Sequence, residues 1–436
     1  MTHKGERHHF QSTTDWLSRW TTLEEVGRSL VDEPSGGLSA WARTTAGVVA
    51  MLLTLQVVTG ALLSFYYVPS VESAHATVAY MEKVVPAGSW IRALHHYGSQ
   101  WLTLFLILHL VQMFWRASYR RRPLGWVASV LLLALVLANG ATGYSLPWDA
   151  RAFFSTRVAE GIAEGLPLIG PAARSWLLGS AEISPLTLAR LYALHLIVVP
   201  ALIFIVVAAR LFVFRERVKA SAPLEQRRAW MRSQLARNAV ASGLVFLALA
   251  LFANRFHAPL GPAADTAMHT YLPRPGAQFL WLFQMLKYLP GRTASLVAVA
   301  LPGLILIALA LLPFLNHAPL SSLLAHPRRK VGIALFTLAL LLFTLLTALA
   351  YLEDARDPRV RAQLARQAAE EEAFRAAPFA PLRLRTSESD TEELDTDTGM
   401  HRRTEAANTS MSSHPESTSP TTPLISASSP PDAYIA

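Results

Sequence analysis

The chain has no cysteine among its 436 residues. It can therefore form no disulfide, supply no thiolate to zinc or to an iron–sulfur cluster, and attach no haem through a thioether bond. Charged residues are also scarce, at 16% of the chain, whereas 52% of the residues are hydrophobic. This composition is too apolar for an ordinary soluble protein of this length, and it indicates long apolar segments.

The few charged residues are mostly basic, which gives a formal net charge of +9 at pH 7. A basic chain can bind nucleic acid. Here, however, the arginines flank apolar runs, which is typical of the cytoplasmic loops of membrane proteins. We therefore expect contact with membrane lipid and none with nucleic acid. Residues 1–11 are polar and rich in histidine, so the sequence indicates no cleavable signal peptide.

Apolar stretches suited to crossing a bilayer recur along the chain, most of them near the roughly 20 residues that a spanning helix needs. Only helices satisfy their own backbone in lipid at this apolarity, so we predict an all-α integral membrane bundle of seven transmembrane helices. The fifth stretch is short unless it begins nearer Arg237. The seven stretches are 45–68, 95–115, 126–146, 188–213, 239–253, 295–315 and 331–351.

Basic residues concentrate in three loops, which follow the second, fourth and sixth spans and therefore fall on one side. The positive-inside rule makes that side cytoplasmic, which places the N-terminus inside and the C-terminus outside. A short surface helix is expected within residues 12–36. A charged helix is expected after Tyr351, and a disordered tail from about Pro378, because its Ser/Thr/Pro-rich composition cannot bury a core.

Histidines within the spans are candidates for function, because ligating side chains in lipid are costly. His95 and His109 lie fourteen residues apart in the second span. On a helix this spacing returns the second side chain to within roughly 40° of the first, about 21 Å along the axis. One helix face could thus hold one ligand near each membrane surface, whereas His96 does not share that face. His195, in the fourth span, lies at the same outer depth as His95.

Two neutral imidazoles at one depth on two helices are what bis-histidine ligation of a b-type haem requires. A pair of polar side chains that are hydrogen-bonded within a bundle core is the alternative. The spacing in the second span and the depth match in the fourth favour the haem.

Four stretches carry a resemblance to a known family. They are Gln56-Val57-Val58-Thr59-Gly60, Arg92-x-x-His95 followed by His109, Gly143-Tyr144-Ser145-Leu146-Pro147-Trp148-Asp149, and Thr187-x-x-Arg190-x-x-x-x-His195 followed by Pro200. Over about residues 14–350 the sequence resembles the cytochrome b subunit of cytochrome bc and b/f quinol-oxidising complexes. It looks closest to the split b/f form, with its two parts fused.

This resemblance implies four regions. The N-terminal segment 1–36 would be cytoplasmic, 37–220 would form a four-helix haem domain, 221–352 would add three helices, and 353–436 would be the charged and then disordered tail. The implied setting is a homodimeric complex in a bacterial inner membrane. The implied substrate is quinone or quinol, and the implied partners are a Rieske iron–sulfur protein and a c-type cytochrome.

The resemblance also implies residue roles. His95 and His195 would ligate the low-potential haem near the outer side, and Arg92 and Arg190 would offset its propionates. Ordinary snorkelling at the interface is the alternative for the arginines. Three glycines would let haem and helices approach closely, although glycine is also frequent in membrane helices. They are Gly60, Gly140 and Gly143.

The chain departs from the family at the inner haem. That haem would need His109 and a partner fourteen or fifteen residues after His195, where Ala209 and Arg210 stand. Neither can ligate iron. An absent inner haem, a haem on His109 alone, and a ligand from elsewhere in the chain all remain open.

It also departs at the outer quinol site. The family places Pro-Glu-Trp-Tyr there, and its glutamate is thought to accept a quinol proton. Here Pro275 is followed by Gly276, Ala277 and Gln278, so no carboxylate is left as general base. Asp149 and Asp265 are the nearest outer acids in the sequence, and we expect both to be solvated loop acids.

Two functions follow. The first is a b-type cytochrome subunit of a bacterial bc-like respiratory complex, which passes electrons from quinol across the membrane through haem b. The alternative is a divergent structural paralogue with one haem or none and no quinol turnover. The retained histidine pair favours the first, and the lost glutamate and haem ligand favour the second.

Overall fold

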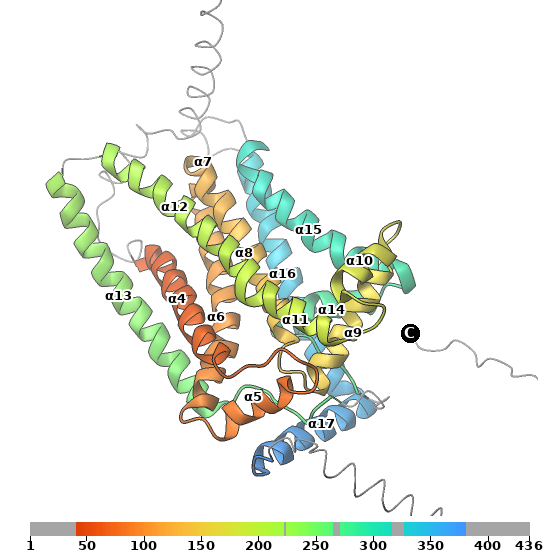
Figure 1. Cartoon of the computed structure of the whole chain (residues 1–436). Helices are drawn as coiled ribbons and strands as arrows, with labels where there is room; N and C mark the ends of the chain where they lie inside the picture. The colour runs from red at the N-terminus through yellow and green to blue at the C-terminus, as the bar shows by residue number, and fades with distance from the viewer. Residues whose placement is uncertain (1–40, 222–223, 265–270, 316–326, 381–436) are drawn as a thin grey trace, which may run out of the picture. The chain divides into compact units, whose positions relative to one another are not determined.

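The computed structural model describes residues 41–221, 224–264, 271–315 and 327–380, and most of them lie in helices (Figure 1). The prediction of an all-α membrane bundle is confirmed. The surface helix expected within 12–36, Asp265 and the tail beyond residue 380 lie outside the described residues.

In the described part of the chain, six helices are long and apolar enough to cross a membrane. The helix α6 is 28 residues long, which corresponds to about 42 Å, and its histidines and glutamines lower its mean hydropathy. We count it as the seventh span. The bundle helices are α4 (Thr45–Ser64), α6 (Gly88–Trp115), α8 (Pro123–Tyr144), α11 (Pro185–Ala193) continued by α12 (Val199–Ser221), α13 (Leu224–Arg255), α15 (Gly291–Leu315) and α16 (Pro327–Arg356).

The fifth span begins earlier than its apolar core. Its candidate membrane segment is Arg232–Arg255, and α13 itself starts at Leu224. From the sequence, this span was expected to be long enough only if it began nearer Arg237. It begins earlier than that, so it is long enough to cross the membrane.

Proline shapes the fourth span. A π-helical turn, Leu194–Val198, joins α11 to α12, and the Val199 N–H bonds back to the carbonyl of Leu194. Pro200 explains this turn, because it has no N–H and its ring would clash with the carbonyl four residues earlier. A π turn inserts one extra residue into the helix, and such turns are frequent at functional sites. His195 lies within it.

The core lies between α4, α6 and α8, with α12 packed on α8 and α13 packed on α4 and α6. Leu52, Leu106 and Trp126 are fully buried there. The indole N–H of Trp126 donates to the carbonyl of Leu309, which ties α15 to the bundle. The predicted four-helix arrangement at the N-terminal half is thus held together by apolar packing.

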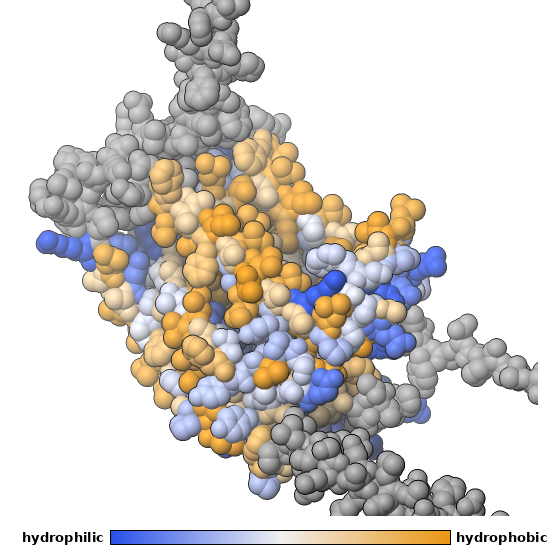
Figure 2. Space-filling model, in the orientation of Figure 1, coloured by the Kyte–Doolittle hydropathy of each residue, from blue (hydrophilic) through white to orange (hydrophobic). Residues whose placement is uncertain are grey.

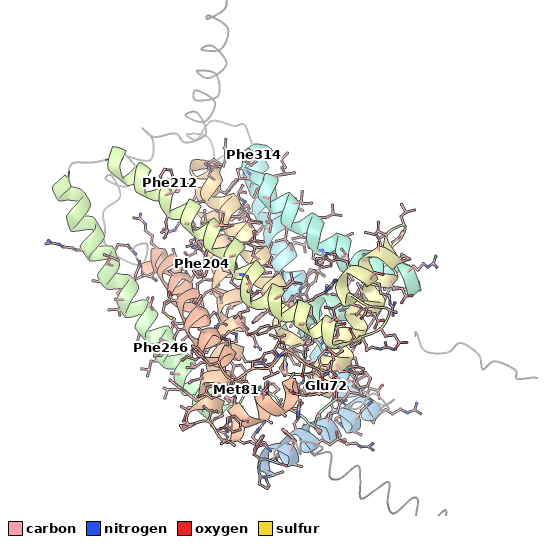
Figure 3. All side chains as sticks on the ribbon, viewed as in Figure 1. Glu72, Met81, Phe204, Phe212, Phe246 and Phe314 are labelled. Atoms are coloured by element: carbon pink, nitrogen blue, oxygen red, sulfur yellow. The ribbon has the colours of Figure 1, made fainter. Side chains whose placement is uncertain are left out.

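Apolar side chains also cover the outside of the bundle. Phe204 and Phe212 on α12 and Phe246 on α13 are exposed (Figure 3). Hydrophobic surface dominates the face over α12 and α15, whereas hydrophilic side chains gather around α9 and α10 (Figure 2). An exposed apolar surface of this extent marks contact with lipid. The chain is therefore a multi-pass membrane protein.

The helix ends before and after the three basic loops lie at one end of the bundle, the top in Figure 1. At the opposite end, which we call the outer end, short helices form a layer over the spans. They are α5 (Ala74–Lys83), α9 (Ala150–Glu164), α10 (Gly170–Leu178), α14 (Leu280–Leu286) and α17 (Pro358–Ala376).

The expected charged helix after the last span is confirmed as α17. It packs on the outer layer, where the Lys83 ammonium donates to the carbonyls of Phe374 and Ala377. Glu371 forms an ion pair with Arg151 at the start of α9. This helix therefore fixes α5 and α9 from the outside.

Asp149 lies inside this layer. Its side chain accepts from the Ala152 N–H at 2.9 Å, which caps α9, and from the Gly261 N–H at 3.0 Å. The residue is only 3% exposed. The expectation of a solvated loop acid was wrong for Asp149, because an aspartate directly before a helical stretch is a strong N-cap. Trp148, the residue before it, has a φ of 51°, which is a left-handed conformation. The two hydrogen bonds of Asp149 hold this conformation in place.

His75 makes the outer layer sensitive to pH. Its Nε2 donates to the carbonyl of Gly261 at 2.8 Å, and its ring lies against Phe374. Burial lowers the pKa of His75 and outweighs the opposing effects of that hydrogen bond and of Asp149, while Lys83 and Arg92 lower the pKa further. The folded protein therefore resists a proton that the unfolded chain accepts near pH 6.5.

We expect the stability of the protein in detergent to fall as the pH drops below about 6.5. Thermal unfolding between pH 7.5 and 5 measures this. The variant His75→Gln keeps an amide donor for Gly261 and removes the titrating group, so its unfolding temperature should fall less. Parallel curves for the two proteins would contradict the assignment.

Candidate functional site

The sequence-predicted pair His95 and His195 meets between α6 and the π turn that precedes α12. The centroids of the two rings lie 6.1 Å apart, with their planes at 80°. A metal–nitrogen bond of about 2 Å on each side would put the centroids of two imidazoles that hold one metal roughly 6 Å apart. The separation therefore matches two ligands of one iron.

The hydrogen bonds of the two rings assign the same tautomer to both. The Thr59 hydroxyl donates to the carbonyl of Leu55, so its oxygen accepts from His95 Nδ1 at 2.9 Å. His195 Nδ1 donates to the carbonyl of Asn139, also at 2.9 Å. Both protons thus sit on Nδ1, and both Nε2 lone pairs are left for a metal. Such partners of the second ring nitrogen are what orients ligating histidines.

Two glycines make room for the imidazoles. A Cβ on Gly143 would lie 2.5 Å from His195 Cε1, and a Cβ on Gly60 would lie 3.1 Å from His95 Cε1. The third predicted glycine, Gly140, faces the Gln278 amide at 3.6 Å instead. Two of the three glycines of the sequence motif therefore touch the histidine pair.

Two buried polar side chains on the same helices bear on whether a haem fits there. The side-chain nitrogen of Gln56 and the side-chain oxygen of Asn139 are buried without a hydrogen-bond partner in the described part of the chain. Gln56 lies one turn before Thr59, and Asn139 holds His195 through its carbonyl. Buried unpaired polar groups are rare and call for an explanation. Together with the free Nε2 atoms, they fit a haem between α4, α6, α8 and α12.

Arg92 is buried at 8% exposure near the outer end of α6. Its guanidinium donates to the carboxylate of Glu82 at 2.6 Å and to the carbonyls of Ala258 and Pro259. The predicted contact with a haem propionate stays a prediction, and it would require Arg92 to release some of these partners. No motif or spacing in the sequence pointed to Glu82, which approaches from the preceding helix α5.

Arg190, the second predicted propionate partner, is exposed. Its guanidinium lies against Gly179 and donates to the carbonyl of Trp176 at 3.0 Å. The Cβ that Gly179 lacks would lie 2.6 Å from this guanidinium. Arg190 thus closes the turn between α10 and α11, and its role toward a haem stays a prediction.

At the inner end of the same helices, His109 faces Arg210. The Arg210 guanidinium lies 2.9 Å from His109 Nε2 and also donates to the Ser129 hydroxyl. His109 Nδ1 lies 3.1 Å from the hydroxyl of Thr45. The second predicted ligand is therefore in place on the helix, but its metal-facing nitrogen already has a partner.

The residues expected at a quinol site surround the 3-10 turn Ala277–Phe279 and α14. The Tyr144 hydroxyl donates to the carbonyl of Arg274 at 2.7 Å, and the side-chain oxygen of Gln278 is buried without a partner among the described residues. Residues 271–286 contain no carboxylate. Asp354, at the outer end of α16, does approach this loop, because its carboxylate forms an ion pair with Arg274. Sequence reasoning missed Asp354, because it follows the predicted last span and is far from this loop along the chain.

The N-terminal half of the chain is similar to known proteins. The profile of the family described as Cytochrome b/b6/petB matches residues 34–218. The menaquinol:cytochrome c reductase cytochrome b subunit of Geobacillus thermodenitrificans is 33% identical over 219 residues, which is 48% of this chain and 97% of that protein. The chain belongs to the cytochrome b/b6 family. It is accordingly a b-type cytochrome of a bc-like complex and an electron-transport protein of the membrane.

Two further relatives agree. The corresponding subunit of Bacillus subtilis (strain 168) is 32% identical over 212 residues, covering 47% of this chain and 95% of that protein. Cytochrome b6 of Prochlorothrix hollandica is 32% identical over 172 residues, covering 39% and 78%. The family implies haem b and interaction with quinone as features of the chain.

The fold is also found in a solved structure. A chain of a hyperthermophilic respiratory Complex III matches with a TM-score of 0.61 and 20% identity, covering 84% of this chain and 97% of that one. The likeness therefore extends well beyond residue 218. At this identity it establishes the architecture of the bundle alone.

Proposed function

We propose that this cytochrome b carries electrons from a quinol through a b-type haem that His95 and His195 hold in the outer half of the membrane. The observation that carries the proposal is the pair of imidazoles 6.1 Å apart, each with its Nδ1 proton donated to the protein. Thr59 and the Asn139 carbonyl orient the rings. The haem, when bound, would supply the one-electron redox chemistry.

We also propose the setting. The two menaquinol:cytochrome c reductase relatives are each covered almost completely by this chain, which supports menaquinol or a similar quinol as donor. A Rieske iron–sulfur protein and a c-type cytochrome are the proposed partners, in a homodimeric complex of a bacterial inner membrane. The basic loops would face the cytoplasm, and the outer layer of short helices would face the partners.

The quinol proton needs an acceptor other than the family's glutamate. Asp354 is the proposed one, because it reaches the loop that has lost that residue and is paired there with Arg274. Its carboxylate is the type of group that accepts a proton as a general base. The Gly276-Ala277-Gln278 run is the observation in favour of the alternative, a structural paralogue without quinol turnover.

Haem content tests the ligand assignment. We expect the pyridine haemochrome assay to find haem b in the purified protein and the variants His95→Ala and His195→Ala to lose the haem that this pair binds. His96→Ala is the matched control, because His96 lies next to His95 and bonds to Gln100 instead. A wild-type protein without haem would refute the proposal, as would equal haem loss in the His96 variant.

Reduction by quinol separates the two functions. A menaquinol analogue should reduce the haem in the purified protein, as followed by its absorbance, and Asp354→Asn should slow this reaction while leaving the haem content unchanged. A haem that dithionite reduces but quinol does not would favour the structural paralogue.

A further inference from the structure

The inner half of the bundle repeats the geometry of the outer half, with one change. His95 and His109 share a face of α6 at fourteen residues' spacing. On the partner helix, fifteen residues separate His195 from Arg210, and His195 itself lies in the π turn Leu194–Val198, whose later residues fall within this interval. Since a π turn takes up one extra residue, fifteen steps there turn the helix about as far as fourteen elsewhere. Arg210 therefore stands where the partner of His109 would stand.

The contacts agree with this register. Arg210 Nη2 lies 2.9 Å from His109 Nε2, the nitrogen that corresponds to the free one in His95. A metal ion would have to lie about 2 Å from the same nitrogen. The guanidinium thus fills the space into which a metal on this nitrogen would have to fit. It has only donors to offer and cannot itself ligate a metal.

The hydrogen bonds around His109 run in one direction, from Arg210 through His109 and Thr45 to Gln112. Arg210 donates to Nε2, so the ring proton sits on Nδ1 and is donated to the Thr45 hydroxyl at 3.1 Å. That hydroxyl in turn donates to the side-chain oxygen of Gln112 at 2.7 Å. His109 is 9% exposed, and both its nitrogens are satisfied. In the outer pair, by contrast, neither Nε2 has a hydrogen-bond partner among the described residues, so the two sites differ in their chemistry.

The space beside the ligand differs as well. Gly143 touches the His195 ring at the outer site. Fourteen residues earlier on α8 stands Ser129, which is fully buried. Its hydroxyl donates to the carbonyl of Gly125 and accepts from Arg210. A glycine that would leave room is thus replaced by a side chain that binds the guanidinium.

We infer that the Arg210–His109–Ser129 cluster excludes a second b haem, so that this cytochrome carries a single b haem, in its outer half. The inference deepens the proposed function and rests on its haem at His95 and His195. It assigns Arg210 as a positioning residue that ties α12 to α6 and α8 through His109 and Ser129. The haem-free inner half is then a structural part of the bundle.

Haem counting tests the inference. We expect the pyridine haemochrome assay, normalised to protein by amino-acid analysis, to give one haem per chain in the wild type and in His109→Ala. The double variant Arg210→His/Ser129→Gly copies the outer pattern of two histidines and a glycine, and we expect it to rise to two haems per chain. Adding His109→Ala to that variant should return the count to one. Arg210→Gln, which removes the guanidinium without supplying a ligand, should also stay at one.

The outcomes separate the two proposals. No haem in the wild type would refute the proposed function, whereas two haems, one of them lost in His109→Ala, would refute the single-haem inference alone. A double variant that keeps its outer haem spectrum but binds no second haem would overturn the assignment of position 210. If the double variant does not accumulate, the counts in the wild type and in His109→Ala still decide.

Discussion

Gly143→Ala should remove most of the haem from the purified protein, although the change adds only one methyl group and replaces no ligand. The new Cβ would stand 2.5 Å from His195 Cε1 and 2.8 Å from Nδ1, closer than such atoms pack. The ring is held on its other side by the bond from Nδ1 to the Asn139 carbonyl. It must therefore move and give up the bond that sets its tautomer, which typically costs ten- to a hundredfold in metal affinity.

Gly60→Ala provides a graded comparison. Its Cβ would meet His95 Cε1 at 3.1 Å, a distance that a small shift of the ring relieves. We expect partial haem loss, so the order of haem content is wild type, Gly60→Ala, Gly143→Ala. Gly161→Ala is the matched control, because nothing lies within 4 Å of its added carbon on α9. The measurement is haem per chain together with the reduced absorbance spectrum.

Normal haem content in Gly143→Ala would show that His195 has room to move and that its close approach to Gly143 does not govern binding. Equal loss in the Gly161 variant would instead point to a general effect on folding. Only the graded order, with the control unchanged, assigns the two glycines to the haem pocket.

The helices and the outer histidine pair were predictable from the sequence, because both depend on local periodicity. Apolar runs set the spans, and the fourteen-residue spacing put His95 and His109 on one face of α6. Matching depths on two spans then paired His95 with His195. Only the contact distance and the tautomers required the structure, since these depend on Thr59 and the Asn139 carbonyl from other helices.

Long-range partners were the part that the sequence could not predict. The spacing showed that Arg210 stands where a second haem ligand would be expected, and arginine cannot ligate iron. It did not show that the guanidinium reaches His109 and Ser129. Likewise Asp354 follows the last span, and nothing local indicates that it meets Arg274 some 80 residues earlier. Each of these contacts is set by how two helices pack, and packing leaves no periodic signal in a single sequence.

Asp149→Ala should be among the most destabilising single substitutions in the outer layer. Ala152 and Gly261 are both buried, and the substitution would leave their N–H groups without an acceptor. An unsatisfied buried donor costs about 1–3 kcal/mol, so two together would cost roughly 2–6 kcal/mol. The cap of α9 and one of the bonds that hold residues 258–264 would be lost in one step.

The comparison with Asp357→Ala isolates burial as the cause. Asp357 caps α17 in the same way, with its carboxylate 2.8 Å from the Arg359 N–H, but it is exposed to solvent. Water can replace that acceptor, so the cost there should be close to the roughly 1 kcal/mol of an ordinary cap. Asp149→Asn should fall between the two, because its amide keeps one oxygen acceptor and can satisfy only one of the two donors.

Thermal unfolding in detergent measures the order, and limited proteolysis shows where the structure opens. Cleavage of Asp149→Ala should concentrate in residues 256–264, since the segment loses both the Gly261 bond and the neighbouring pairing of Ala150 with Pro262. The proposed haem site at His95 and His195 lies in the bundle rather than in this layer, so a haem there should be retained at temperatures at which the loop is already cut. If haem and loop are lost together, the outer layer and the haem bundle unfold as one cooperative unit, and Asp149 then stabilises the redox site itself.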